Sequence, residues 1–210
     1  MQNDFGAPGG MFARAGIDIG CIRAAVAPTA RVLAAGRAAG MAVVYLKMGF
    51  RPDLSDFGAP RAPNRVKHGP LGVGDAVTSP AGRPSRILIR DTWNTDILDE
   101  LTPEPGDAVV WKTRYSGFFE TELDALLRAR GVRSLLVTGC TTSVCVDSTI
   151  RDAMFRDYPC LLLEDCTAEP VGNDLPRTNH EASLLILQGL FAWVATSATL
   201  VSALSPDHQE

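Results

Sequence analysis

The stretch of sequence that decides the fold reads Val137-Thr138-Gly139-Cys140-Thr141-Thr142-Ser143-Val144-Cys145-Val146-Asp147-Ser148-Thr149. The apolar run at 135–137 is typical of a buried strand, and it breaks at Gly139. After a few small or hydroxylated residues, Val146 and Ile150 are spaced as on one face of a helix. The sequence therefore predicts that Cys145 lies where a strand turns into a helix.

A thiol at such a turn points toward the unpaired backbone N–H groups that begin the helix. Their partial positive charge favours the thiolate over the thiol, and the same groups can hold an oxyanion. Our working hypothesis is that Cys145 is a nucleophile. The other cysteines are Cys21, Cys140, Cys160 and Cys166. An odd number without a CxxC pair favours a reducing cytoplasm.

Composition indicates one soluble globular domain over residues 1–210. Apolar residues make up 46% and charged residues 21% of the 210 residues. No apolar run approaches the ~20 residues that a membrane span needs. The net charge of -4 and the scattered arginines indicate no nucleic-acid surface, so we expect a small-molecule partner.

Apolar runs alternate with helical patterns along the chain. The sequence predicts strands at 41–46, 107–111, 134–138, 159–164 and 199–204. It predicts helices at 22–39, 94–101, 121–130, from the turn to 157, and at 175–193. This alternation favours a three-layer α/β/α domain with a mainly parallel sheet.

Residues 49–86 differ from the rest of the chain. They are rich in proline and glycine and show no sustained periodicity. A loop of this length in a compact domain is usually functional, so we expect a lid or a subunit arm, with a surface excursion as the alternative.

The predicted strand ends carry the polar residues Lys47, Lys112, Cys140 and Asp165. In parallel sheets the chemistry gathers at these carboxyl ends. Lys112 precedes an aromatic-rich loop, where its ammonium can stabilise a thiolate. A solvated lysine at a strand exit is the alternative.

Three sequence motifs carry a resemblance to a known family. They are Gln2-Asn3-Asp4-Phe5, the strand-end Lys112, and Gly139-Cys140-Thr141-Thr142-Ser143-Val144-Cys145-Val146. In order and spacing the whole chain resembles the isochorismatase-like cysteine hydrolases. The segment 112–119 is similar to that of ureidoacrylate amidohydrolases, and 51–54 and 161–166 are similar to segments of biuret and triuret hydrolases.

The resemblance implies a Cys-Lys-Asp triad that hydrolyses a C–N bond of an amide or ureide without a cofactor. Cys145 would attack the carbonyl, and water would then cleave the acyl or carbamoyl enzyme. The oxyanion donors would be the N–H groups of Thr141 and Cys145, with a cis peptide before Thr141. The resemblance also suggests homodimers or homotetramers.

The resemblance implies several substrate-binding residues. Tyr115, Asn64 and Gln188 correspond to substrate-facing positions, and the amide of Gln188 can both donate to a urea carbonyl and accept from its NH₂. Phe50 and Arg51 begin the long loop, where Arg51 could bind a substrate carboxylate.

The sequence departs from the family at its beginning. In the family the catalytic aspartate comes immediately before the motif x-Gln-Asn, at the carboxyl end of an apolar first strand. This chain begins at the x of that motif, which is Met1. Asp4 corresponds to a later acid. We therefore expect an upstream strand ending in Asp, without which the neighbouring strands would expose unpaired ladder groups.

Metal binding is not indicated, since His68, His180 and His208 lack ligand spacing. The loop word Arg51-Pro52-Asp53-Leu54 lacks the histidine of the metal-binding nicotinamidases. The alternative functions are a non-catalytic binding or assembly protein, and a hydrolase of the isochorismatase or nicotinamidase type.

Overall fold

The computed structural model describes residues 1–205, and His208 lies outside them. Its helices are α1 (Asn3–Gly6), α2 (Met11–Arg14), α3 (Gly20–Ala24), α4 (Val26–Ala38), α5 (Pro63–His68), α6 (Leu123–Ala129), α7 (Asp147–Met154), α8 (Asn179–Leu190) and α9 (Ser197–Ala203). Its strands are β1 (Val44–Met48), β2 (Ala76–Thr78), β3 (Pro84–Arg86), β4 (Ala108–Lys112), β5 (Leu135–Cys140), β6 (Cys160–Ala168) and β7 (Trp193–Ala195). Short 3-10 turns are formed by Gly69–Leu71, Trp93–Thr95 and Asp99–Leu101, and a π-helical turn, η4, by Thr142–Val146.

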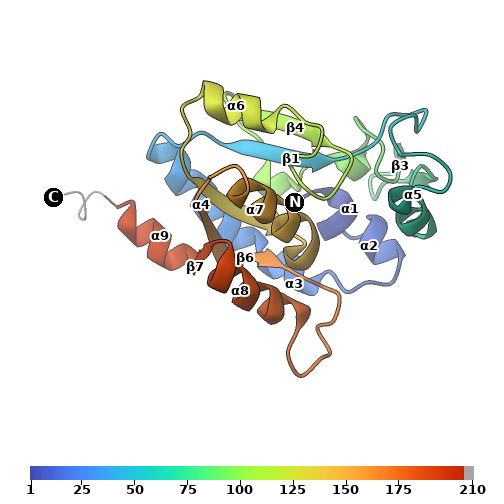
Figure 1. Ribbon diagram of the computed structural model, residues 1–210. Coiled ribbons are helices and arrows are strands. Elements are labelled where there is room, and N and C mark those ends of the chain that lie inside the picture. Colours follow the sequence, from blue (N-terminus) through green and yellow to red (C-terminus); the bar gives the residue numbers. More distant parts are fainter. Residues whose placement is uncertain (206–210) are drawn as a thin grey trace.

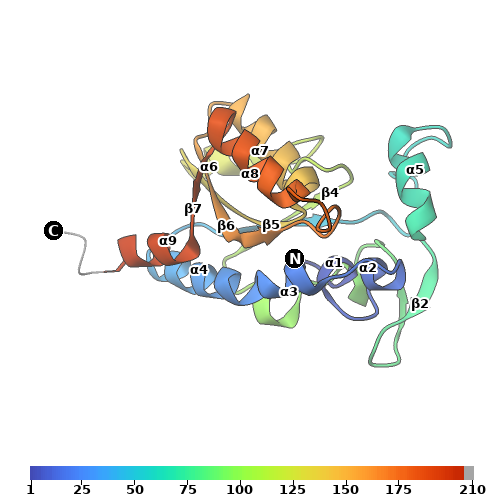
Figure 2. The ribbon, with the colours of Figure 1, turned by 90° about the horizontal axis from the view of Figure 1, so that it is seen from below.

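Helices cover both faces of the strands (Figures 1 and 2). α6, α7 and α8 lie on one face, and α1, α3, α4 and α9 lie on the other (Figure 2). β1 pairs in parallel with β4, and β5, β6 and β7 form a second parallel set. This is the three-layer α/β arrangement that the sequence predicts.

The two parallel sets of strands are not joined. β1 pairs on one edge with β4, and β5 pairs on one edge with β6, so the other edges of β1 and β5 have no strand partner among residues 1–205. Between them lies a cavity of about 530 Å³, lined mainly by apolar residues that include the runs 41–46 and 132–140. The expectation that neighbouring strands would expose unpaired edges agrees with this gap.

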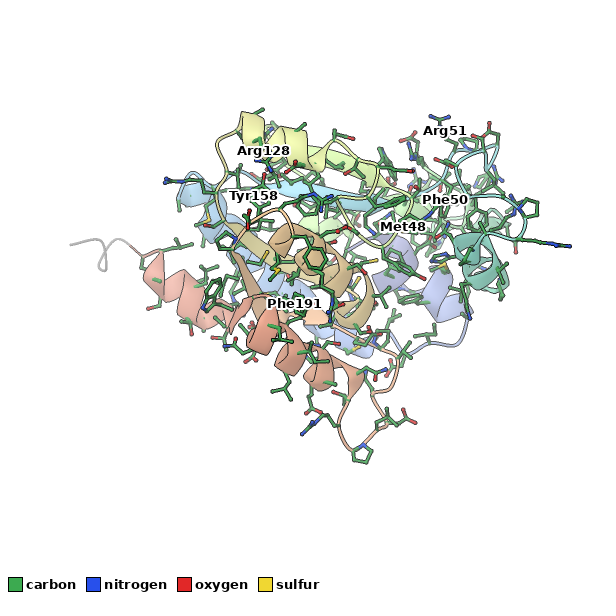
Figure 3. All side chains as sticks on the ribbon, in the orientation of Figure 1. Met48, Phe50, Arg51, Arg128, Tyr158 and Phe191 are labelled. Atoms are coloured by element: carbon green, nitrogen blue, oxygen red, sulfur yellow. The ribbon has the colours of Figure 1, made fainter. Side chains whose placement is uncertain are left out.

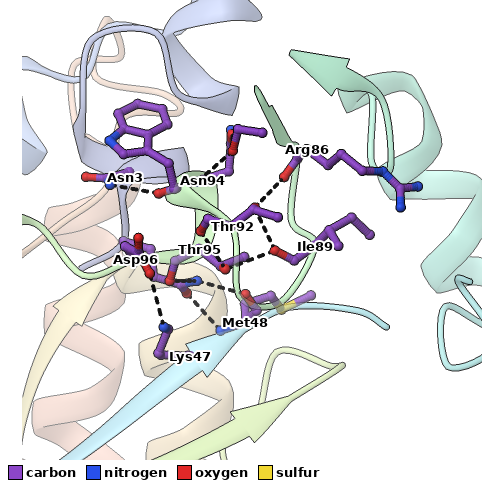
Figure 4. Close-up of polar contacts among 12 residues, drawn as sticks. Asn3, Lys47, Met48, Arg86, Ile89, Thr92, Asn94, Thr95 and Asp96 are labelled. Atoms are coloured by element: carbon purple, nitrogen blue, oxygen red, sulfur yellow. Dashed lines mark hydrogen bonds and ion pairs between the residues drawn. The ribbon is translucent and has the colours of Figure 1, made fainter. Parts of the chain in front are cut away.

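The first residues attach the chain to the carboxyl end of β1 (Figure 4). The Gln2 amide donates to the carbonyls of Met48 and Thr95 at 2.8 and 3.1 Å, and accepts from the Met48 N–H at 2.8 Å. Asn3 Nδ2 donates to the Trp93 carbonyl at 2.8 Å. These buried amides satisfy backbone groups that would otherwise lack partners.

The fully buried Asp4 completes this attachment. Its carboxylate accepts from the backbone N–H groups of Met11 and Leu88 at 2.9 and 2.7 Å, and from Asn94 Nδ2 at 2.5 Å. Asp4 therefore holds three segments of the chain together.

Local chemistry explains where the later helices begin. Thr178 and Glu181 form a capping box that starts α8 at Asn179 rather than at the predicted 175. The Thr196 hydroxyl accepts from the Thr199 N–H and starts α9.

Two predicted elements are wrong. Residues 199–203, predicted as a strand, belong to the helix α9, and the last strand is the shorter β7. Residues 94–101 lie in two 3-10 turns rather than in a helix. The hydroxyls of Thr92 and Thr95 donate to the Ile89 carbonyl, and such side-chain bonds to the backbone compete with helix formation.

The segment 49–86 is more regular than its sequence indicates. It contains α5 and the antiparallel pair of β2 and β3, and it packs on an apolar cluster that includes Phe50, Phe57 and Ile89. Its role as a lid or subunit arm stays a prediction. No helix within residues 1–205 is both long enough and apolar enough to cross a membrane.

Candidate active site

Cys145 lies in the π-helical turn η4, between β5 and α7. The sequence prediction of a strand-to-helix turn is confirmed. Gly139, with a φ of +125°, lets the chain leave β5 at an angle that other residues rarely adopt. The thiol is half-buried at this carboxyl end of the parallel strands.

Lys112 ends β4, and its ammonium lies 3.3 Å from the Cys145 sulfur. The side chain is buried, with 4% of its surface exposed. Nζ donates to the carbonyls of Arg114 and Tyr115 at 3.0 and 2.9 Å, which fixes it toward the thiol. A positive charge at this distance stabilises a thiolate.

The turn before Cys145 offers a free backbone donor. Thr141 is buried and follows a cis peptide bond from Cys140, as the resemblance implies. The Thr141 carbonyl accepts from Val144 and Val146. Its own N–H meets no acceptor among residues 1–205 and is free for an oxyanion.

Two polar groups that the sequence analysis missed hold this turn. The Glu169 carboxylate, 1% exposed, accepts from the N–H and the hydroxyl of Ser143 at 3.1 and 2.5 Å. The Thr142 hydroxyl bonds His180 Nδ1 at 2.9 Å.

The position of Glu169 directly after a strand could have identified it from the sequence. β6 continues to Ala168, so Glu169 follows it, whereas the predicted strand-end residue Asp165 lies within β6 and bonds Ser197. Lys47, also predicted at a strand end, instead lies over the Trp111 ring.

The other four thiols differ from Cys145 in their surroundings. Burial raises the pKa of Cys140 to about 12 and the pKa values of Cys160 and Cys166 to about 11. Burial also raises the pKa of Cys21. Burial therefore disfavours the thiolate at these four positions, whereas Cys145 lies beside the Lys112 ammonium and is the candidate nucleophile.

Three of the predicted substrate-binding residues lie near one another beside Lys112. Tyr115 follows it in the loop after β4, and burial, followed by the charge of Cys145, raises the Tyr115 pKa. Phe50 is fully buried and packs on Phe57, and Asn64 donates to the Phe57 carbonyl at 3.1 Å. Phe50 therefore supports the loop rather than covering a ligand.

Arg51 and Gln188 lie apart from this group. Arg51 is exposed at the beginning of the long segment (Figure 3). Gln188 is exposed near the end of α8, where its oxygen accepts from the Val194 N–H at 2.6 Å. The structure thus does not bring Gln188 to Cys145, since the part of α8 that reaches the η4 turn is its beginning, at His180.

The cavity between β1 and β5 opens at this site. Lys112 and Cys145 both line it, together with Met1 and Cys140. No carboxylate within residues 1–205 bonds Lys112 or Cys145. In that same part of the chain no three His, Cys, Asp or Glu side chains are grouped to hold a metal ion.

The fold and the site define an α/β protein with a thiol and an ammonium paired at the carboxyl ends of parallel strands. The sequence profile of the protein family described as the isochorismatase domain matches residues 1–199 of this chain. The chain belongs to the isochorismatase family and is a hydrolase.

Known proteins resemble it over most of its length. It is 40% identical over 210 residues to a protein of Methylorubrum extorquens named ureidoacrylate amidohydrolase RutB, which covers 99% of this chain and 81% of that protein. Among solved structures, a cysteine hydrolase from Pseudomonas syringae pv. phaseolicola has a TM-score of 0.80 at 30% identity, covering 97% and 88% of the two chains. N-carbamoylsarcosine amidase from Thermoplasma acidophilum has a TM-score of 0.66 at 25% identity, covering 94% and 92%.

Proposed function

We propose that this protein is a cysteine-dependent amidohydrolase that cleaves a C–N bond of a small linear ureide. The observation that carries the proposal is the 3.3 Å contact between Lys112 Nζ and Cys145 Sγ beside the free Thr141 N–H. The names of two relatives, a ureidoacrylate amidohydrolase and an N-carbamoylsarcosine amidase, support a substrate that carries a carbamoyl group.

In the proposed reaction the Cys145 thiolate attacks the carbonyl carbon, and a C–S bond forms. The N–H groups of Thr141 and Cys145 hold the resulting oxyanion. The C–N bond then breaks, and the amine or ammonia leaves with the proton that the Cys145 thiol lost on becoming a thiolate. Water attacks the thioester, or the thiocarbamate from a ureide, and releases the thiolate.

Two protons move in this reaction, one from the thiol to the leaving nitrogen and one from the attacking water, and a general base has to accept each of them. Asp4 is not suited to this task, because its two oxygens already accept three hydrogen bonds. Glu169 is engaged with Ser143 and Val171. We assign the base to a carboxylate outside residues 1–205.

The cavity between β1 and β5 supports this assignment. An extended apolar segment there would pair with the free edges of both strands. If it ran parallel to them, its carboxyl end would reach Lys112 and Cys145. A carboxylate at that end would also give the buried Lys112 ammonium an anionic partner.

An ammonia-release assay over ureidoacrylate, biuret and triuret tests the proposal. The chain is compared with two versions extended before Met1 by six apolar residues, one ending in Asp and the other in Asn. We expect the Asp version to be faster than the Asn version by at least about 100-fold, the typical contribution of a general base.

Further variants separate the parts of the proposal. Cys145→Ser should abolish the activity of every version, and Lys112→Met should lower it by about 100-fold or more through the lost charge. Equal rates for the Asp and Asn versions would refute the assigned base. A folded Asp version that releases no ammonia from any ureide would favour the non-catalytic alternative.

A further inference from the structure

A ureide carries N–H donors on both sides of its carbonyl, and these need acceptors in a buried site. Gln188, the residue predicted for this task, lies on the exposed side of α8. We propose that His68 accepts a hydrogen bond from the terminal NH₂ of a ureide and thereby selects ureides; the inference rests on the proposed function above.

His68 belongs to a row of rings that leads to the site. This aromatic row consists of Phe50, Phe57, His68 and Tyr115, with successive ring centroids 4.5, 6.5 and 5.2 Å apart. Its last member, Tyr115, bonds Lys112 Nζ through its carbonyl at 2.9 Å. His68 therefore lies one ring away from a residue that contacts the catalytic ammonium.

One nitrogen of His68 is fixed by the backbone. Nδ1 lies 2.8 Å from the Asn64 carbonyl. A carbonyl only accepts hydrogen bonds, so Nδ1 carries the proton and Nε2 carries the lone pair in the neutral ring. The backbone contact therefore selects the tautomer in which Nε2 is an acceptor.

Nε2 itself is unused. It makes no hydrogen bond within the described chain, although the residue is only 6% exposed. Among residues 1–205, the fully buried polar atoms without a partner do not include His68 Nε2, so part of the surface of this atom is accessible. A small donor can approach it there.

The surroundings keep this acceptor available at neutral pH. Burial lowers the pKa of His68, and the charges of Lys112 and Arg114 lower it further, against the opposing effect of the Asn64 carbonyl. The imidazole is therefore neutral at pH 7. No hydrogen bond joins His68 to Cys145, so its proposed role is to position the substrate rather than to move a proton.

Calorimetric titration with 3-ureidopropionate tests the proposal. All titrations use the Cys145→Ser background, which cannot form the carbamoyl enzyme, so binding is measured apart from turnover; the wild type is then the protein with His68 unchanged. The second ligand is the derivative with two methyl groups on the terminal nitrogen. The protein variants are His68→Phe, which keeps the ring and removes the acceptor, and His68→Gln, which restores an acceptor oxygen. Phe57→Leu is the matched control in the same aromatic row.

We expect His68→Phe to weaken binding of 3-ureidopropionate about tenfold, the usual effect of one lost hydrogen bond. His68→Gln should recover part of this loss, and Phe57→Leu should bind within about twofold of the wild type. The dimethyl derivative should bind the wild type and His68→Phe equally. Urea unfolding of each variant shows that the fold is kept.

Two outcomes would overturn the inference. One is equal affinity of the wild type and a folded His68→Phe for 3-ureidopropionate. The other is the same loss for both ligands, which would show a change of shape rather than a lost acceptor. The proposed function can fail on its own. In that case a ureide would still bind in a way that depends on His68, but no ammonia would be released.

Discussion

At the scale of single residues, the thiol of Cys145 is distinguished from its neighbours by position and by charge. It lies half-buried at the Lys112 ammonium, whereas burial raises the pKa values of the other four thiols. Because alkylation proceeds through the thiolate, the thiols should react at different rates.

Iodoacetamide at pH 7 should therefore label Cys145 first, followed only slowly by the others. Peptide mass spectrometry after short exposures measures the order. In Lys112→Met the labelling of Cys145 should slow, because the thiolate loses its cation. Uniform slow labelling of all five cysteines would speak for a non-catalytic protein.

Asp4 gives a prediction on pH and stability. Burial raises its pKa to about 6 despite the three donors that oppose the shift. The folded protein thus holds this proton at pH values where the unfolded chain, with a pKa of about 3.9, has lost it. As pH rises from about 4 to 6, this group should lower the free energy of unfolding, by up to about 3 kcal/mol.

Urea unfolding of the wild type and Asp4→Asn between pH 4 and 7 checks this sign. The wild type should lose stability relative to the variant over this range, because only the wild type has the carboxyl group. Parallel pH profiles of the two proteins would contradict the raised pKa.

At the scale of elements, the η4 turn is held by Glu169, the residue that follows β6. The buried Glu169 carboxylate accepts two hydrogen bonds from Ser143 and one from the Val171 N–H. Bonds to a charged acceptor are stronger than neutral ones. The turn that carries Thr141 and Cys145 should therefore depend on this charge.

Glu169→Gln should lower the free energy of unfolding by about 1.5–3 kcal/mol, because a neutral amide replaces the charged acceptor. Its turnover should also fall, since the oxyanion donor sits in the same turn. Glu164→Gln, at a half-buried position within β6, is the control and should change stability by less than about 0.5 kcal/mol. Equal effects of the two substitutions would contradict this role.

The sequence predicts those features that depend on local order along the chain. Strand ends next to a glycine turn predict the pairing of Lys112 with Cys145, because parallel strands bring their carboxyl ends together. It misplaces Asp165 and Gln188, since the strand ends four residues later and the helix begins four residues later than predicted, which changes the residues that reach the turn. His68 was missed because its segment shows no periodicity, so nothing indicated that it packs on Tyr115.

At the scale of the whole molecule, apolar side chains are exposed on the α8 side. Leu185, Ile186, Leu190 and Trp193 are 46–70% exposed. Surfaces of this kind mark interaction sites in soluble proteins. Together with the family resemblance, they lead us to propose that a second copy of the chain covers this face.

Light scattering after gel filtration tests the proposed assembly. The wild type should be a dimer or larger, and Leu190→Glu should shift it toward the monomer by placing a charge in the contact. Val66→Glu, at an exposed position on α5, is the control and should leave the mass unchanged. A monomeric wild type would refute this arrangement.

The cavity between β1 and β5 links the whole molecule to its chemistry. It separates two parallel sets of strands, and it ends at Lys112 and Cys145. Within residues 1–205 no carboxylate bonds Lys112 or Cys145 at this end, so the described residues supply no base for the attack of water on the carbamoyl enzyme. The covalent intermediate should then form slowly and also be lost slowly.

The most direct measurement is therefore the mass of the protein after mixing with a ureide and quenching in acid. The account predicts one carbamoyl group on the Cys145 peptide, absent in Cys145→Ser and lost faster from the version extended by a segment ending in Asp. Ureide hydrolysis that continues undiminished in Cys145→Ser, with no adduct on the wild type, would contradict it.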